Sequence, residues 1–218
     1  MKSTPRYFSN LGSRVYIDSY PSDVFNISEI HPSMTFWELC GGVGNDLWYL
    51  LDKGIVFPKN LYFVEKDPEH FCKAYGRLSK FFSDPNDHMI LGDVNRVKGS
   101  PNSSDIVYMN NSLHAFSNIE QFEGLMATVV LLLKPGGSFV GRALSSDVDK
   151  KILEQIRGKA GRSFHVETAD KLISGKFRGA SEGALGAIWK KYGGSNVTVI
   201  TERDPNKPTA NLYFRCIK

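Results

Sequence analysis

The sequence has few cysteines, isolated histidines and no long apolar segment. Its three cysteines, Cys40, Cys72 and Cys216, are scattered and odd in number, which excludes a disulfide framework and a zinc cluster. This usage predicts a reducing intracellular compartment, the cytoplasm or the nucleus. The longest apolar run, 127–133, is far shorter than the roughly 18 residues of a membrane span. We therefore expect neither a metal site nor a membrane partner.

The composition of the 218-residue chain is that of an ordinary globular protein, with 41% hydrophobic and 23% charged residues. The net charge of +4 is unevenly distributed, because segment 147–191 carries 10 basic against 6 acidic residues. A basic segment suits an acidic partner such as nucleic acid or chromatin. A solvated helical surface is the alternative interpretation of the same charges.

Short apolar runs alternate with longer amphipathic stretches through the middle of the chain. The apolar runs predict strands at 35–40, 61–64, 88–91, 106–109 and 138–143. The amphipathic stretches predict helices at 45–53, 69–82 and 119–133. This alternation predicts an α/β fold with a doubly wound, mainly parallel sheet.

The two ends of the chain depart from this alternation. Runs 197–202 and 211–217 have no helix between them, so we expect a C-terminal antiparallel hairpin that brings the sheet to seven strands. Lys-Pro-Gly-Gly at 134–137 predicts a type II turn with a positive φ at its first glycine. Residues 1–34 are rich in aromatics and are expected to form an N-terminal arm or lid on a single domain, 35–218.

The first predicted strand ends in a glycine-rich loop, Glu38-Leu-Cys-Gly-Gly-Val-Gly-Asn45. Ligands of open parallel sheets bind beyond the carboxyl ends of the strands, where glycine lets the backbone approach the ligand closely. A dinucleotide fingerprint needs a third glycine three residues after Gly44, but position 47 is Leu. Glu65 follows Gly44 by 21 residues, the place of an acid that binds ribose hydroxyls. The pattern favours a nucleoside-containing cofactor other than NAD.

These features resemble class I, seven-strand, Rossmann-like S-adenosylmethionine-dependent methyltransferases over residues 35–143 and 197–217. The loop from Glu38 to Gly44 is similar to their acid-x-Gly-x-Gly-x-Gly signature, and Glu65 to their ribose-binding acid. Asp93 is similar to the family's acceptor for the adenine amino group. The resemblance implies S-adenosyl-L-methionine as the cofactor. It implies these binding residues: Glu38, Cys40, Gly41, Gly42, Gly44, Asn45, Glu65, Lys66, Asp93, Val94 and Asn110.

Cys40 departs from the family signature, because it stands where the family has its first glycine. We expect Gly41 to supply the backbone freedom that a cysteine lacks. The departure also leaves open a catalytically inactive, methyltransferase-like binding module.

In the family, the residues that follow the fourth strand lie beside the transferred methyl group. Here Asn110, Asn111 and His114 follow that strand, without the two prolines typical of enzymes that methylate bases or glutamine. The Asn pair resembles non-SET histone lysine methyltransferases, which implies a macromolecular acceptor, either protein lysine or RNA. Segment 113–116 with the later Lys-Pro-Gly-Gly resembles small-molecule methyltransferases, which implies the alternative acceptor.

Each candidate residue at this end of the sheet has a structural alternative. Asn110 and Asn111, predicted to be catalytic, are also typical of a turn after a strand. His114 suits a general base, or it packs against the following helix. Tyr20 is expected to bind an amine by cation–π contact, or the arm packs on the sheet. The predicted phosphate- and base-binding residues, with a plain exposed loop as the alternative, are Lys176 and Arg178.

Overall fold

The computed structural model of the protein describes residues 15–113, 119–148, 182–203 and 209–218. Three residues singled out in the sequence, His114, Lys176 and Arg178, lie outside these ranges. No helix within the described ranges is both long and apolar enough to span a bilayer.

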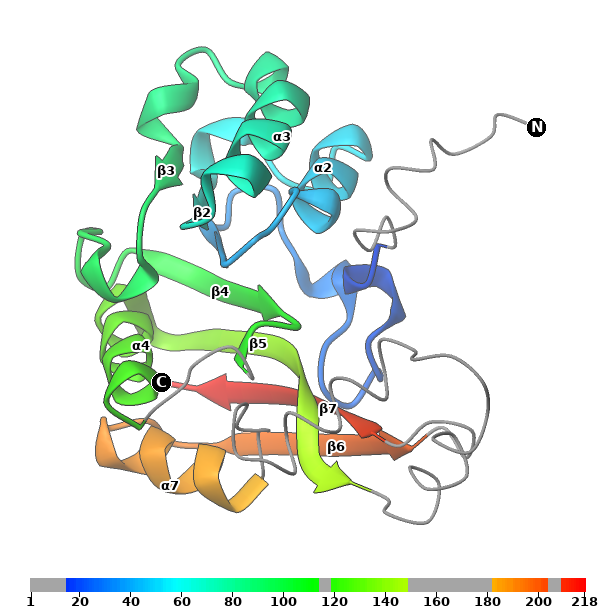
Figure 1. Cartoon of the computed structure of the whole chain (residues 1–218), viewed down its shortest axis with the longest axis vertical. Helices are drawn as coiled ribbons and strands as arrows, with labels where there is room; N and C mark the ends of the chain where they lie inside the picture. The colour runs from blue at the N-terminus through cyan, green and yellow to red at the C-terminus, as the bar shows by residue number, and fades with distance from the viewer. Residues whose placement is uncertain (1–14, 114–118, 149–181, 204–208) are drawn as a thin grey trace.

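Seven strands form one sheet in the order β3-β2-β1-β4-β5-β7-β6 (Figure 1). The strands are β1 Phe36–Leu39, β2 Leu61–Glu65, β3 Met89–Leu91, β4 Ser104–Asn110, β5 Leu133–Val148, β6 Val197–Arg203 and β7 Thr209–Ile217. Strands β1 to β5 are parallel, whereas β7 is antiparallel to both β5 and β6. The predicted doubly wound sheet with a C-terminal antiparallel hairpin is confirmed. Because the strand order reverses between β1 and β4, ligand binding is expected at their carboxyl ends.

Helices cover both faces of the sheet. They are α2 Asn45–Asp52, α3 Pro68–Leu78, α4 Ile119–Leu132 and α7 Glu182–Lys191. Alternate residues of β4 face opposite sides, with Val107 and Met109 packed toward α4 and Ile106 and Tyr108 packed toward α2. Helices α4 and α7 contact each other on one face, and α2 and α3 contact each other on the other.

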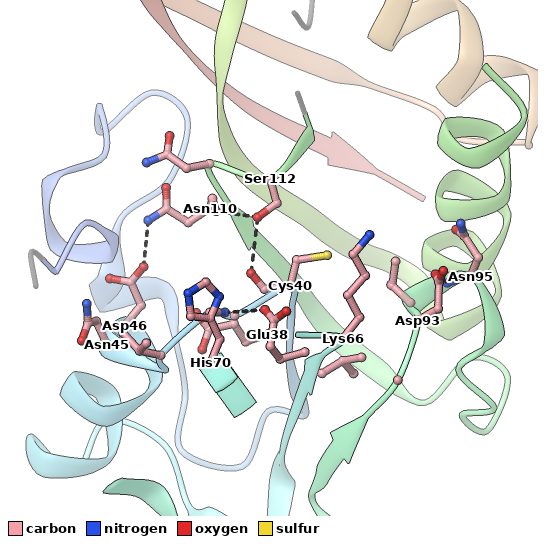
Figure 2. Close-up of a pocket in the computed structure, with 18 of the residues that line it drawn as sticks. Glu38, Cys40, Asn45, Asp46, Lys66, His70, Asp93, Asn95, Asn110 and Ser112 are labelled. Atoms are coloured by element: carbon pink, nitrogen blue, oxygen red, sulfur yellow. Dashed lines mark hydrogen bonds between the residues drawn. The ribbon is translucent and has the colours of Figure 1, made fainter. Parts of the chain in front are cut away.

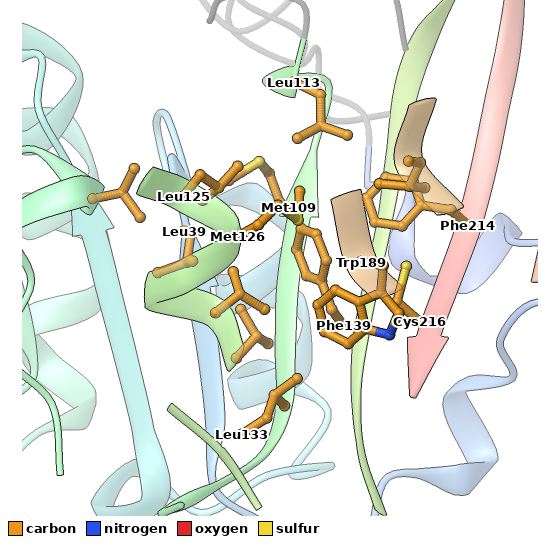
Figure 3. Packing of buried hydrophobic residues seen from close by; sticks show 14 of the residues in the cluster. Leu39, Met109, Leu113, Leu125, Met126, Leu133, Phe139, Trp189, Phe214 and Cys216 are labelled. Atoms are coloured by element: carbon orange, nitrogen blue, oxygen red, sulfur yellow. The ribbon is translucent and has the colours of Figure 1, made fainter. Parts of the chain in front are cut away.

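The core on the α4 and α7 face is built from long apolar side chains (Figure 3). Trp189 of α7 is fully buried and stacks on Phe139 of β5, which in turn meets Phe214 of β7 edge-on. The Trp189 indole N–H donates to the Ile217 carbonyl at 2.9 Å. The helix is therefore fixed to the C-terminal strand by both packing and a hydrogen bond.

The core on the α2 and α3 face includes the segment before the first strand. Ile17, Val24 and Phe25 are at most 2% exposed and pack in one cluster with α2, α3 and the sheet. Tyr20 is buried beside Tyr108 and Tyr213, with ring centroids 5.9 and 5.2 Å away. Residues 15–34 are thus part of this core.

Local sequence signals account for several element boundaries. Helix α3 begins at Pro68, because the Asp67 carboxylate accepts the N–H groups of Glu69 and His70. The helix predicted over 69–82 ends at Leu78 and continues as a short 3-10 turn. Gly136 has a φ of +80°, as the predicted type II turn requires, and β5 already begins before that turn.

Candidate functional site

A cavity of about 410 Å³ lies at the carboxyl ends of β1, β2 and β4 (Figure 2). Most of the residues that the sequence predicts as cofactor-binding line it, together with Asn111. They are Glu38, Cys40, Gly41, Gly42, Asn45, Glu65, Lys66, Asp93, Val94 and Asn110. Gly44 is the exception, because it faces α3, where an added Cβ would lie 2.8 Å from Leu78. Gly44 therefore serves the close packing of two helices.

Glu65, at the end of β2, holds the glycine-rich loop. One carboxylate oxygen accepts the N–H of Gly42 and the other accepts the N–H of Asp67, both at 2.8 Å. Each carboxylate oxygen has a second lone pair, so Glu65 can still accept hydrogen bonds from a ligand. Gly42 has a φ of +57°, and an added Cβ there meets no protein atom within 4 Å. A ligand therefore has open access to the backbone at Gly42.

The strained residue of the glycine-rich loop is Cys40. The expectation that Gly41 supplies the backbone freedom is wrong. Cys40 itself adopts the left-handed conformation with a φ of +53°, whereas Gly41 does not. Gly41 is required for another reason, since an added Cβ would lie 2.2 Å from the Phe63 ring. Burial, assisted by the charges of Glu65 and Asp93, raises the pKa of the Cys40 thiol to about 12. The thiol is thus protonated at neutral pH.

Glu38 places a buried carboxyl group on the wall of the cavity. The residue is 3% exposed, and its Oε2 atom has no hydrogen-bond partner among the described residues. Burial raises the pKa of Glu38 well above its usual range, and the charges of Asp46 and Glu65 raise it further. A buried oxygen without a partner is costly, so it marks a place for a hydrogen-bond donor from a ligand.

The end of β4 contributes two further buried oxygens. The Oδ1 atoms of Asn110 and Asn111 are buried and have no partner in the described part of the chain. Asn111 has a φ of +54°, and its N–H donates to the Arg142 carbonyl at 2.7 Å. The Ser112 hydroxyl lies 2.9 Å from the Asn110 carbonyl and 3.3 Å from the Cys40 carbonyl, so this turn lies against the glycine-rich loop (Figure 2).

The far wall of the cavity comes from the segment after β3. The Asp93 carboxylate accepts the N–H of Asn95 and so caps a short 3-10 helix, Val94–Arg96. The side chains of Asp93 and Lys66 both border the cavity. Tyr20, the predicted acceptor-binding residue of the arm, does not line the cavity.

Comparisons with known proteins rest on structure, since no protein-family model and no curated protein matches the sequence. A SAM-dependent methyltransferase from Thermotoga maritima aligns over 98% of this chain and 93% of its own, at 16% identity and a TM-score of 0.62. Geranyl diphosphate C-methyltransferase from Streptomyces coelicolor aligns over 86% and 73%, at 9% identity and a TM-score of 0.61. The match to phosphoethanolamine N-methyltransferase 2 from Haemonchus contortus covers 88% of this chain at 13% identity and a TM-score of 0.62, but only 51% of that longer chain.

The chain has the class I methyltransferase fold. Identities this low establish the fold alone. The glycine-rich loop lies between β1 and α2 of this fold.

Asp46 lines the cavity, although it is not among the residues predicted from the sequence. Its Oδ1 accepts the N–H groups of Tyr16 and Ile17 at 2.6 and 3.2 Å. Its Oδ2 accepts the Tyr108 hydroxyl at 2.8 Å and the Asn110 amide at 3.1 Å. Burial raises the pKa of Asp46, although all four hydrogen bonds lower it. The sequence did contain a signal for a buried Asp46. It lies four residues before Leu50, so both side chains are on the same, buried face of the short helix.

Replacing Cys40 by glycine is expected to give a more stable protein than replacing it by alanine. Cys40→Gly removes the cost of a left-handed cysteine, about 1 kcal/mol, whereas Cys40→Ala removes the thiol and keeps that cost. Denaturant unfolding should therefore give a free energy of unfolding about 1 kcal/mol higher for Cys40→Gly than for Cys40→Ala. Equal stabilities of the two variants would contradict a strained backbone at Cys40.

Asp46→Ala is expected to lower the free energy of unfolding by about 3 kcal/mol or more, because it leaves two buried and two partly buried donors without their acceptor. Asp52→Ala, an exposed position at the end of the same helix, serves as the control and should change stability by less than about 0.5 kcal/mol. Urea titration of both variants measures the difference. A loss of similar size in both would mean that the buried network contributes little.

Proposed function

We propose that this protein is an S-adenosylmethionine-dependent methyltransferase. The observation that carries the proposal is the charge of the cavity around the glycine-rich loop. Of the described residues, four carboxyl groups and one lysine, Lys66, line it; the acids are Glu38, Asp46, Glu65 and Asp93. An acidic cavity suits a cofactor with a sulfonium and an ammonium group, and it disfavours the negative pyrophosphate of NAD.

The lining residues fit the parts of this cofactor. Glu65 keeps lone pairs for ribose hydroxyls, and Asp93 is the acceptor proposed for the adenine amino group. The unpartnered oxygens of Glu38 and Asn110 suit an ammonium group. When bound, the cofactor supplies an electrophilic methyl group. The part of the protein is to position the acceptor atom near Asn110 and Asn111 and to exclude water from it.

A small molecule is the acceptor that we favour. Two of the structural neighbours are described in complex with small phosphorylated compounds, phosphomonomethylethanolamine and geranyl diphosphate. The second candidate is the macromolecular acceptor predicted from the sequence, protein lysine or RNA, which is favoured by the basic segment 147–191. Its proposed contact residues, Lys176 and Arg178, lie outside the described residues, as does the proposed base His114.

Glu65→Ala is expected to weaken the binding of S-adenosylhomocysteine by about 1.5–3 kcal/mol, the usual range for hydrogen bonds to a charged group. Glu69→Ala, an exposed carboxylate in the first turn of α3, is the control and should leave the affinity unchanged. Isothermal calorimetry measures both, with NAD as a second ligand. Binding of NAD without any response to S-adenosylhomocysteine would contradict the proposed cofactor.

A labelled-methyl assay on cell lysate distinguishes the acceptor classes. With the purified protein and labelled S-adenosylmethionine, we expect label in the small-molecule fraction, and nuclease treatment of the lysate should not reduce it. Label confined to protein or to nuclease-sensitive RNA would favour the second candidate. Cofactor binding with no label in any fraction would favour an inactive binding module.

A further inference from the structure

Arg142 on β5 does not line the cavity itself, but it contacts Tyr16, which does. It is the register partner of Asn110 on the neighbouring parallel strand, so their side chains share one face of the sheet. The guanidinium lies over the Tyr16 ring at 4.3 Å and within 5.9 Å of the Tyr213 ring centroid. Tyr16 itself lines the cavity. Arg142 is therefore on the strand next to Asn110 and in contact with a ring that lines the cavity.

The charge of Arg142 is not paired with a carboxylate of any described residue. Its Nε and Nη2 atoms donate to the same acceptor, Asn211 Oδ1, at 3.3 and 3.0 Å. Nη1 has no hydrogen bond to a described residue. Arg215, another half-buried arginine of the same sheet, does pair with a carboxylate, that of Glu29 at 2.7 Å. A half-buried guanidinium next to a cavity, with donors left over, is suited to receive an oxyanion.

We propose that Arg142 determines acceptor specificity by binding a carboxylate or phosphate group of a small methyl acceptor. The inference rests on the proposed methyl transfer. Because Arg142 and Asn110 are register partners on adjacent parallel strands, an anionic group at Arg142 and an acceptor atom beside Asn110 lie at the same end of the sheet. An acceptor that reaches both residues can be a compact molecule. The Tyr16 and Tyr213 rings hold the planar guanidinium in place, which lowers the entropy lost when it binds the anion.

The test uses the whole protein saturated with S-adenosylhomocysteine, and inorganic phosphate and acetate as probes. Calorimetric titration should show binding of one of them, which distinguishes a phosphate from a carboxylate acceptor. Arg142→Gln should weaken that binding by about tenfold to a hundredfold, the loss of hydrogen bonds to a charged group. Arg142→Lys keeps the charge without the planar fork and should weaken it less.

Arg215→Gln is the matched control and should leave anion binding unchanged, because Arg215 is already paired with Glu29. S-adenosylhomocysteine affinity should be the same in all variants. Unchanged anion affinity in both Arg142 variants, with S-adenosylhomocysteine still bound, would overturn the inference alone. Failure of the unaltered protein to bind S-adenosylhomocysteine would overturn the proposed function, on which the inference about Arg142 rests. Arg142-dependent binding of a single-stranded RNA oligonucleotide, and of neither small anion, would show that the acceptor is not a small molecule.

Discussion

The buried carboxylate of Asp46 is the interaction on which the arrangement of the site depends. It accepts hydrogen bonds from the segment before the first strand and from two side chains of β4, Tyr108 and Asn110. A charge that is removed from water is stable only when such partners surround it. The need to satisfy Asp46 therefore fixes residues 15–17 against the cavity and orients the amide of Asn110.

The acids of the site share one electrostatic environment. Glu38 is buried close enough to Asp46 and Glu65 that both charges raise its pKa. Like charges held near each other in a buried wall favour the arrival of a cation. The backbone N–H of Gly42, which could otherwise bind an anion, is already donated to Glu65. The site is consequently better suited to a cationic ligand than to a phosphate.

On β5, the strand next to β4, the same face of the sheet carries the positive charge of Arg142. Arg142 is held by Tyr16 and by Asn211, and none of the described carboxylates pairs with it. The segment before β1 contributes to both sides, since the backbone of Tyr16 binds Asp46 while its ring lies over the guanidinium. The side chains along this face thus change from acidic at the cavity to basic at Arg142. The proposed cationic cofactor and the proposed anionic acceptor would therefore bind at different places.

Local patterns in the sequence determined the strands, helices α2, α3 and α4, the turn at Gly136 and the terminal hairpin, because each depends on residues near in sequence. They did not predict helix α7. They also identified Glu65 as the acid after the second strand, since its spacing from Gly44 follows from one strand–helix–strand unit. Only the tertiary structure showed which residue of the loop is strained, because Cys40 has a φ of +53° whereas Gly41 packs closely against the Phe63 ring. It also showed the contacts of Asp46 and Arg142, whose partners are at least 29 residues away in the sequence. Contacts between distant residues depend on how the whole sheet assembles, and periodicity and spacing carry no record of them.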